Sequence, residues 1–254
     1  MHSFLLRNFI PDNIATKLWG DREKWGLKVI ETDLCWQKWL QVSSDFYNSN
    51  QREGVGSIVN NAGYKSISDI DLTGKTVLEI GAGDIQHIRY WSGKPSQYFL
   101  VDVSPEMLEK SIQCLKKFAV PYQGFLIDRS DKLPFKDNSV DIIVSYFSLE
   151  HLYPLLPYLE DFHRVLKPGG FFVGALPAEG GALWGLGRFF TTRRWFKAHT
   201  DINPDKIICW EHPNFADKVI TKLDQVFNRV GLSFWPGIVS HLDLNLVIKF
   251  VYQK

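Results

Sequence analysis

One stretch of ten residues, 76–85 with the sequence TVLEIGAGDI, restricts the fold of this chain more than any other. Its first half is mostly apolar and strand-forming, as in a strand that is buried on both faces of a parallel sheet. Gly81 and Gly83 follow at once, and because neither carries a Cβ the backbone can turn tightly and approach a ligand closely. Asp84 then has the position of a helix N-cap. This succession predicts the nucleotide-type binding edge of an α/β fold.

A second strand that ends in a carboxylate belongs to the same predicted site. Residues 97–102 read QYFLVD, and Asp102 lies 23 positions after Glu79. In α/β folds, a carboxylate about 20 residues past the glycine loop holds ribose hydroxyls. The dinucleotide fingerprint G-x-G-x-x-G has a third glycine where this chain has Gln86, and Asp84 would repel a pyrophosphate. The sequence therefore favours an adenosine ligand without phosphate, and S-adenosylmethionine meets that description.

Strands and helices alternate over residues 74–176, and this alternation predicts a parallel sheet. Ser104 and Pro105 have the N-cap and first-turn positions of a helix, and further helices are expected at 154–166 and 215–229. The other strands are expected at 122–127, 140–145, 171–176, 232–235 and 242–252. Because no helix separates the last two strands, they predict an antiparallel hairpin at the sheet edge.

Four segments carry a resemblance to a known family. They are VLEIGAGD (77–84), FLVDVSPEMLEKS (99–111), LPFKDNSVDIIVSYFSLEHL (133–152) and FHRVLKPGGFFVGALP (162–177). In this order they resemble the class I S-adenosylmethionine-dependent methyltransferases of the small-molecule type; the departure is Ile85, where many relatives carry a third glycine. The resemblance implies a Rossmann-like α/β fold with a mostly parallel seven-stranded sheet, an antiparallel C-terminal hairpin strand, helices on both faces and an N-terminal helical cap.

The resemblance also implies which residues hold S-adenosylmethionine as the cofactor. Asp102 would accept the ribose hydroxyls, and an acidic side chain after the third strand would reach the exocyclic amine of adenine. We assign that second role to Asp128, with Arg129 and Ser130 beside it and Asp131 as a rival. The full set expected to contact the cofactor is Glu79, Gly81, Ala82, Gly83, Asp84, Asp102, Val103, Met107, Asp128, Arg129, Ser145 and Tyr146.

Methyl transfer from a sulfonium is an in-line displacement, so the protein mainly aligns the reacting atoms, which can be worth roughly 7–11 kcal/mol. A hydroxyl acceptor also profits from a general base. His151 is the first catalytic candidate because it follows the fourth strand at the ligand edge. His212, with Glu211 as an orienting partner, is the second, and His199 is the third. No residues have the spacing of a metal site, so we expect no metal.

The residues after the fourth strand narrow the class of acceptor. Methyltransferases of planar amino groups resemble one another in an Asn/Asp-Pro-Pro-aromatic motif, where this chain has SYFS at 145–148. We therefore expect a small-molecule acceptor with a reactive oxygen (a metabolite, a sugar or a lipid precursor), and carbon methylation stays open. The alternatives are a catalytically inactive S-adenosylmethionine-binding partner protein and a nicotinamide oxidoreductase, which Asp84 and the missing glycine oppose.

Residues 1–70 precede the first strand and are expected to form an N-terminal cap of two or three amphipathic helices. Their tryptophans, among them Trp36 and Trp39, recur at roughly helical spacing. Burial preference favours packing of these side chains onto the sheet. In the alternative arrangement the segment covers the substrate, and Phe46, Tyr47 or Tyr64 lines a pocket.

Residues 71–254 form the predicted cofactor-binding domain, and 177–213 form an insertion in it. Four glycines predict that the insertion is irregular, either as a solvated loop or as a lid over the site. The insertion is also basic, through Arg188, Arg193, Arg194 and Lys197. These side chains would hold an anionic group of the substrate or rest on a membrane surface.

Composition limits the partners and the compartment. A net charge of +1 gives no reason to expect nucleic-acid binding. Three cysteines far apart in sequence are typical of a reduced, cytoplasmic protein. We find no apolar run of about 18 residues and no secretion signal, so we expect no transmembrane segment. Peripheral membrane contact and the oligomeric state stay open.

Overall fold

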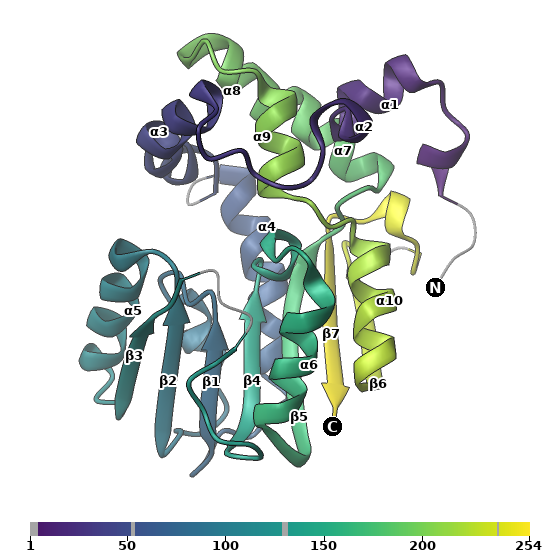
Figure 1. Ribbon diagram of the computed structural model, residues 1–254. Coiled ribbons are helices and arrows are strands. Elements are labelled where there is room, and N and C mark those ends of the chain that lie inside the picture. Colours follow the sequence, from purple (N-terminus) through teal and green to yellow (C-terminus); the bar gives the residue numbers. More distant parts are fainter. Residues whose placement is uncertain (1–4, 52–53, 129–131, 238) are drawn as a thin grey trace.

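The computed structural model describes residues 5–51, 54–128, 132–237 and 239–254, without the side chains of residues 44, 47–51, 54 and 55. Figure 1 shows an α/β part built around a sheet and a group of helices above the carboxyl ends of its parallel strands. The upper group consists of α1–α3 and α7–α9, and we call it the cap. Among the described residues, no helix is both long and apolar enough to cross a lipid bilayer.

The sheet has seven strands in the order β3-β2-β1-β4-β5-β7-β6. They are β1 (Thr76–Ile80), β2 (Gln97–Asp102), β3 (Tyr122–Leu126), β4 (Val140–Tyr146), β5 (Leu166–Pro177), β6 (Asn228–Trp235) and β7 (Val247–Gln253). The first five are parallel, while β7 is antiparallel to β5 on one side and to β6 on the other. The predicted parallel sheet with an antiparallel C-terminal hairpin is confirmed. Because β1 pairs with β2 on one side and β4 on the other, the strand order reverses there, and open α/β sheets bind ligands at such a point.

Helices surround the sheet and build the cap above it. The α-helices are α1 (Asp12–Trp19), α2 (Arg22–Trp25), α3 (Leu34–Gln51), α4 (Gly54–Tyr64), α5 (Pro105–Lys117), α6 (Leu155–Val165), α7 (Ala182–Phe190), α8 (Thr192–His199), α9 (Pro204–Glu211) and α10 (Ala216–Val226). The short 3-10 helices are η1 (Leu6–Asn8), η2 (Lys65–Ile67), η3 (Gln86–Tyr90), η4 (Leu149–His151) and η5 (Leu242–Leu244). The helices expected at 154–166 and 215–229 therefore exist, and the second is shorter because β6 begins at Asn228.

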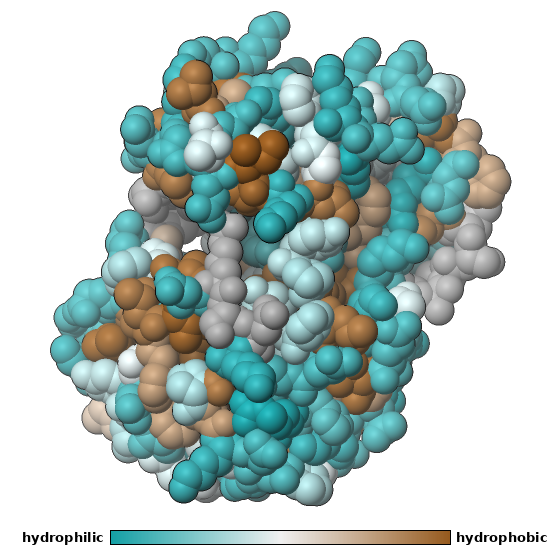
Figure 2. Space-filling view, viewed as in Figure 1, coloured by the Kyte–Doolittle hydropathy of each residue, from teal (hydrophilic) through white to brown (hydrophobic). Residues whose placement is uncertain are grey.

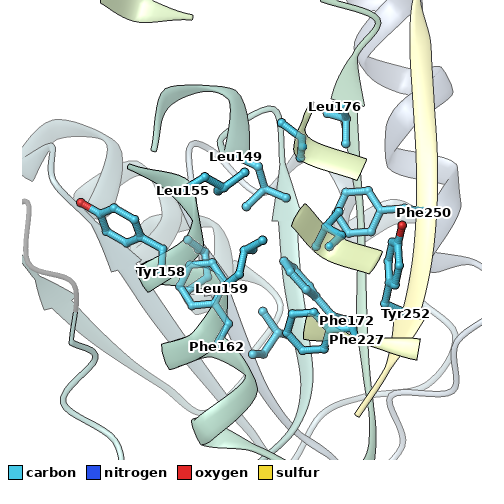
Figure 3. Close-up of a cluster of buried hydrophobic side chains, with 14 of the residues drawn as sticks. Leu149, Leu155, Tyr158, Leu159, Phe162, Phe172, Leu176, Phe227, Phe250 and Tyr252 are labelled. Atoms are coloured by element: carbon cyan, nitrogen blue, oxygen red, sulfur yellow. The ribbon is translucent and has the colours of Figure 1, made fainter. Parts of the chain in front are cut away.

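Successive side chains of the central strands point to opposite faces of the sheet, and each face is covered by its own apolar core. On β1, Leu78 and Ile80 join the core with α6 and α10, while Val77 joins the core with α4, η2 and α5. Figure 3 shows the first core, where Phe162 of α6 and Phe227 after α10 contact Phe172 of β5. Both cores hold the parallel strands rigid up to their carboxyl ends, where the predicted site lies.

The cap has an apolar core of its own, made from two distant segments of the chain. Trp36, Trp39 and Phe46 of α3 pack against Phe196 of α8 and Trp210 of α9. The prediction that the N-terminal tryptophans pack onto the sheet is therefore wrong. Their partners come from the insertion, because the apolar faces of its helices and the apolar face of α3 are buried against each other.

The insertion is not irregular, which corrects a second prediction. Residues 177–213 contain α7, α8 and α9 in spite of their four glycines. One glycine in α7 has a clear packing role, because a Cβ on Gly185 would lie 2.8 Å from Nε1 of Trp19. The glycine lets α7 approach α1 closely. The stabilisation from that contact exceeds the loss that results from the low helix propensity of glycine.

Candidate active site

The turn after β1 is built by two glycines in left-handed backbone conformations. Gly81 has φ 69° and Gly83 has φ 55°, values that L-residues with a side chain rarely adopt. A Cβ on Gly81 would lie 2.6 Å from Cβ of Ser148, whereas nothing lies within 4 Å of the position of a Cβ on Gly83. Gly81 therefore allows close packing against the exit of β4, and Gly83 leaves a bare backbone beside open space, as a ligand cradle requires.

Asp102 at the end of β2 is tied to this turn. Its Oδ1 accepts the N–H of Ser104 at 2.8 Å, and its Oδ2 accepts the N–H of Gly83 at 3.4 Å. Burial raises the pKa of Asp102, although these backbone N–H groups oppose the shift. Each carboxylate oxygen has two lone pairs, so acceptor capacity remains for ligand hydroxyls. The predicted pairing of the glycine turn with Asp102 is thus present in the structure.

The segment after the turn differs from the prediction of a helix capped by Asp84. The 3-10 helix η3 begins at Gln86, and its N-cap is Ile85 with φ 50° and no side-chain cap. Asp84 instead accepts a hydrogen bond from the side-chain amide of Gln86 at 2.8 Å. Ile85 takes the left-handed conformation that a third glycine would adopt easily, and its side chain is buried in the core behind the turn, which offsets the strain.

The buried carboxylate of Glu79 is the centre of a hydrogen-bond network. Its Oε1 lies 2.8 Å from Nε2 of His87, and its Oε2 accepts the hydroxyl of Tyr98 at 2.7 Å. The indole N–H of Trp91 donates to Nδ1 of His87 at 2.9 Å, which places the ring proton on Nε2, facing Glu79. Both carboxylate oxygens are therefore engaged by the protein. Sequence reasoning missed His87 as a partner of Glu79, since only the fold brings the two together.

A small cavity lies beside the turn. It is lined by Tyr64, Glu79, Gly81, Ala82, Gly83, Asp84, Ile85, Gln86, His87 and Tyr146. Tyr146 lies with its ring 4.7 Å from that of His87 and 5.3 Å from that of Tyr64. Of the aromatic residues proposed to line a pocket, Tyr64 does so, whereas Phe46 lies in the cap core. The side chain of Tyr47 is outside the described residues.

The remaining predicted cofactor residues lie along the same sheet edge. Ser145 is buried, with its hydroxyl 2.6 Å from that of Ser148. Val103 is 60% exposed just past β2, and Met107 lies in the first turn of α5, where its N–H donates to the hydroxyl of Ser104. Asp128 is exposed after β3. Arg129, Ser130 and Asp131 lie outside the described residues. Figure 2 shows a hollow between the cap and the α/β part on this side of the molecule.

The two histidines proposed as bases lie in contact, although they are 61 positions apart. The rings of His151 (in η4) and His212 (after α9) are 4.7 Å apart at their centroids. The N–H of His151 bonds to the carbonyl of Ser148, the residue that packs against Gly81, so the pair adjoins the glycine turn. His199 is exposed on α8, where its ring stacks on Trp195, and it is not part of this pair.

Each histidine has its own carboxylate, and the assignment differs from the predicted one. Nδ1 of His151 bonds to the backbone carbonyl of Glu211 and lies 3.3 Å from its Oε2. Nδ1 of His212 instead lies 3.1 Å from Oε2 of Glu179, which follows β5. Glu211 therefore orients His151 rather than His212. Sequence reasoning missed Glu179, although its place after a strand at the carboxyl edge of the sheet was an available signal.

Arg188 holds Glu179 in place from α7. Its guanidinium donates to both carboxylate oxygens at 2.7 and 2.5 Å, and the indole N–H of Trp184 donates to Oε2 at 2.9 Å. The pair is buried, so this interaction is a charge-assisted bidentate bond out of contact with solvent. Arg188 is thus engaged by the protein and is not available to hold an anionic substrate.

The surrounding charges separate the protonation states of the two rings. Burial opposes the charge of His151, but the hydrogen bond and charge of Glu211, with the charge of Glu150, raise its pKa to about 9. Burial and the nearby Arg188 lower the pKa of His212 to about 4. Near neutral pH, His151 is therefore an imidazolium and His212 a neutral imidazole. Nδ1 of His212 also lies 3.3 Å from a guanidinium nitrogen of Arg188, which can only donate. The neutral ring therefore keeps one lone pair, on Nε2 when Nδ1–H donates to Glu179 and on Nδ1 when Nδ1 accepts from Arg188.

Glu150 adds an unsatisfied group to this cluster. Its side chain is 2% exposed, and its Oε2 has no hydrogen-bond partner among the described residues. Oε1 lies 3.9 Å from Nε2 of His151. Burial raises the pKa of Glu150 to about 7, although the charge of His151 opposes the shift. Within the described part of the chain, no three metal-ligating side chains are grouped as in a metal site.

Comparison with known proteins adds to this geometry. Residues 78–174 match a family model described as a methyltransferase domain. Over 115 residues, the chain is 31% identical to the probable phthiotriol/phenolphthiotriol dimycocerosates methyltransferase 2 of Mycobacterium ulcerans, covering 44% of this chain and 43% of that protein. It is 34% identical over 127 residues to the mitochondrial arginine-hydroxylase NDUFAF5 of Danio rerio, covering 49% and 36%. The matched stretch thus spans less than half the length of these relatives.

Solved structures share the fold at low sequence identity. A methyltransferase from Aquifex aeolicus, described as dependent on S-adenosylmethionine, superposes with a TM-score of 0.56 at 18% identity, over 82% of this chain and 96% of that one. A methyltransferase from Mesorhizobium loti with the same description has a TM-score of 0.51 at 16% identity, over 72% and 93%. These likenesses extend beyond residues 78–174 and show that the sheet and its covering helices follow a common plan.

Proposed function

Because the chain belongs to the class I S-adenosylmethionine-dependent methyltransferase family, we propose that it binds S-adenosylmethionine at the carboxyl edge of the sheet and transfers the methyl group to a small-molecule acceptor. The observation that carries this proposal is the glycine turn joined to Asp102 at the point where the strand order reverses. The bare backbone of Gly83 and the carboxylate of Asp102 suit an adenosyl ligand, and Asp84 disfavours a dinucleotide.

The cofactor residues have distinct proposed roles. Asp102 accepts the ribose hydroxyls, Gly83 provides the backbone approach, and Asp128 accepts from the adenine amine. Ser145, Tyr146, Val103 and Met107 line the same edge. Glu79 lines the small cavity beside the turn, and His87 and Tyr98 orient its carboxylate by one contact to each oxygen. S-adenosylmethionine supplies an activated methyl group on a cationic sulfur, and the protein aligns it with the acceptor.

For the acceptor we propose an oxygen nucleophile, deprotonated by His212. The sequence ranked His151 first, but an imidazolium cannot accept a proton, and His212 is the neutral ring. The proposed base is Nε2 of His212, in the tautomer whose Nδ1–H donates to Glu179. Glu179 and Arg188 orient His212, in the manner of a carboxylate that fixes the tautomer of a catalytic histidine. His151, as a cation that is 32% exposed, is suited to hold the acceptor by a hydrogen bond.

The cap is proposed to cover the acceptor. Helices α1–α3 of residues 1–70 and α7–α9 of residues 177–213 lie above the sheet edge, whereas α4 packs on the sheet (Figure 1). His212 and Arg188 belong to the second of these segments. Closing the site in this way excludes water from the reacting atoms, which strengthens the electrostatic interactions inside.

Two measurements test the proposed function. Isothermal titration with S-adenosylmethionine and with NAD should show binding of the first alone, and binding of NAD alone would contradict the proposal. Release of labelled methyl groups to a panel of alcohols, sugars and hydroxylated lipids should then detect transfer. The hydroxylase relatives share the same stretch, so binding by itself does not select this reaction. Binding without transfer to any acceptor would favour an inactive cofactor-binding partner protein.

A further inference from the structure

Helix α7 has an apolar face that is exposed in the described part of the structure. Leu183, Leu186 and Phe190 are 37%, 46% and 53% exposed, and their spacing of three and four residues places them in one stripe. Phe189 beside them is 38% exposed, and its ring contacts that of Phe190. We propose that this stripe, with the basic residues of α8, docks the protein onto an anionic lipid surface. This inference concerns a surface that the proposed methyl transfer does not use.

The charges around the stripe favour that occupant. Residues 180–200 contain three arginines, one lysine and no acidic residue. Arg188 is paired with Glu179, and Arg193 with Asp205. Arg194 and Lys197 are exposed and have no carboxylate partner among the described residues, and the guanidinium of Arg194 lies 5.4 Å from the ring centroid of Phe190. An apolar stripe bordered by free cations is typical of helices that lie in a membrane interface.

The helix that carries the stripe is firmly held, so the stripe is a preformed surface. The opposite face of α7 is anchored by the ion pair of Arg188 with Glu179 and by the contact of Gly185 with Trp19. The N–H of Ala182 at its first residue donates to the buried carboxylate of Asp243 at 2.9 Å. A fixed helix loses little conformational freedom on docking, which favours binding.

A second copy of the chain is a poorer occupant than a lipid surface. In a symmetric dimer the same patch meets itself, so Arg194 and Lys197 of both copies would approach each other. An anionic bilayer instead neutralises these cations while it buries the stripe.

Co-sedimentation with vesicles of phosphatidylcholine and phosphatidylglycerol (about 7:3, chosen so that the surface is anionic) tests the proposal. The full chain should bind these vesicles and should bind vesicles of phosphatidylcholine alone more weakly. Binding to the anionic vesicles should also weaken in about 0.5 M salt, because salt screens the attraction between the basic residues and the lipid charges. The double variant Arg194→Gln, Lys197→Gln should lower the partition coefficient about 30-fold, corresponding to about 1 kcal/mol for each basic residue. The double variant Leu186→Ser, Phe190→Ser should lower it at least about 10-fold, because binding scales with the buried apolar area.

Matched changes at the end of α5 serve as controls. Phe118 is 54% exposed there, close to the exposure of Phe190, and Lys116 and Lys117 precede it. Phe118→Ser and the pair Lys116→Gln, Lys117→Gln should leave vesicle binding unchanged. The proposal is overturned if the full chain does not bind anionic vesicles, if the control changes reduce binding as much, or if light scattering shows a dimer that Leu186→Ser, Phe190→Ser dissociates. Cofactor titration of every variant, independent of lipid, checks that each one folds.

Discussion

Two networks of histidine and carboxylate near the glycine turn differ in almost every physical respect. The first joins Glu79, His87, Trp91 and Tyr98 and draws all of its members from 20 consecutive positions. The second joins Glu150, His151, Glu179, Glu211 and His212 with Arg188, and spans 63 positions. In the first network both carboxylate oxygens of Glu79 and both ring nitrogens of His87 have partners, whereas in the second Oε2 of Glu150 has none among the described residues.

The difference shows how the same residue types serve as support or as reactive groups. A network in which every polar side-chain atom already has a protein partner is suited to support a backbone turn. A network that is partly exposed, with shifted pKa values and one free imidazole nitrogen, can exchange a proton with a substrate. His87 and His212 therefore have different expected roles, although both lie next to a glutamate.

The largest effect should follow from loss of the proposed base in the second network. His212→Ala should lower kcat by about 10²–10⁴-fold, the usual contribution of a general base, with little change in the affinity for S-adenosylmethionine. Methyl-transfer kinetics and cofactor titration measure the two quantities. His199→Ala, which removes an exposed histidine outside the network, is the control. Equal losses of turnover and cofactor affinity would assign His212 to the scaffold.

Removal of the central carboxylate of the first network should act on stability. Glu79→Ala leaves Nε2 of His87 and the hydroxyl of Tyr98 buried without a partner, and each such group costs about 1–3 kcal/mol. We expect a loss of about 3 kcal/mol in the free energy of unfolding, measured by urea denaturation. Tyr98→Phe removes one hydrogen bond to a carboxylate and leaves Oε2 of Glu79 buried without that partner, so it should cost about 2 kcal/mol. If Glu79→Ala were to abolish turnover at unchanged stability, the division between the two networks would be wrong.

Asp102 belongs to neither network, and its substitution tests whether this residue binds S-adenosylmethionine. Asp102→Ala should weaken S-adenosylmethionine binding by roughly 10- to 100-fold, since a hydrogen bond to a charged group is worth about 1.5–3 kcal/mol. Titration calorimetry measures the dissociation constant. Asp201→Ala in the cap, where the carboxylate pairs with Lys38, should not change it. Unchanged affinity in the Asp102 variant would remove this residue from the site.

The smallest effect concerns the pH dependence of stability that His151 contributes. Its pKa in the folded protein is about 9, above the ordinary value of about 6.5 in the unfolded chain. The stabilisation is therefore complete below pH about 6.5 and is lost as the pH rises through 9. Its size is limited because the side chain is 32% exposed and solvent screens the charge.

Denaturation at pH 6 and at pH 9.5 can detect this contribution. His151→Gln should lose stability relative to the unchanged chain at the lower pH, and the difference should shrink at the higher pH. A constant difference would show that the imidazolium of His151 is not what stabilises the cluster.

The α/β part was predictable because its signals are local. The strand, the two glycines and the carboxylate that ends the next strand lie within 27 positions, and parallel strands bring their carboxyl ends together in any such sheet. The antiparallel hairpin followed from the lack of a crossover helix between the last two strands, although residues 242–244, expected as strand, form the short helix η5 before β7. The cap was not predictable to the same extent, because an amphipathic helix reveals that it buries a face and does not reveal its partner. For the same reason, Trp36 and Trp39 were assigned to the sheet rather than to α8 and α9.

The sequence by itself determined the type of sheet and the glycine turn with Asp102, and it supplied His151 and His212 as candidates for proton exchange. The tertiary structure alone decided which histidine is neutral. That outcome depends on the carboxylate and the guanidinium that face each ring, and Glu179 and Arg188 reach His212 only through the packing of α7 over the end of β5. Electrostatic interactions act through space over a few ångströms, so a pKa is a property of the folded neighbourhood, whereas strand and turn preferences are properties of adjacent residues.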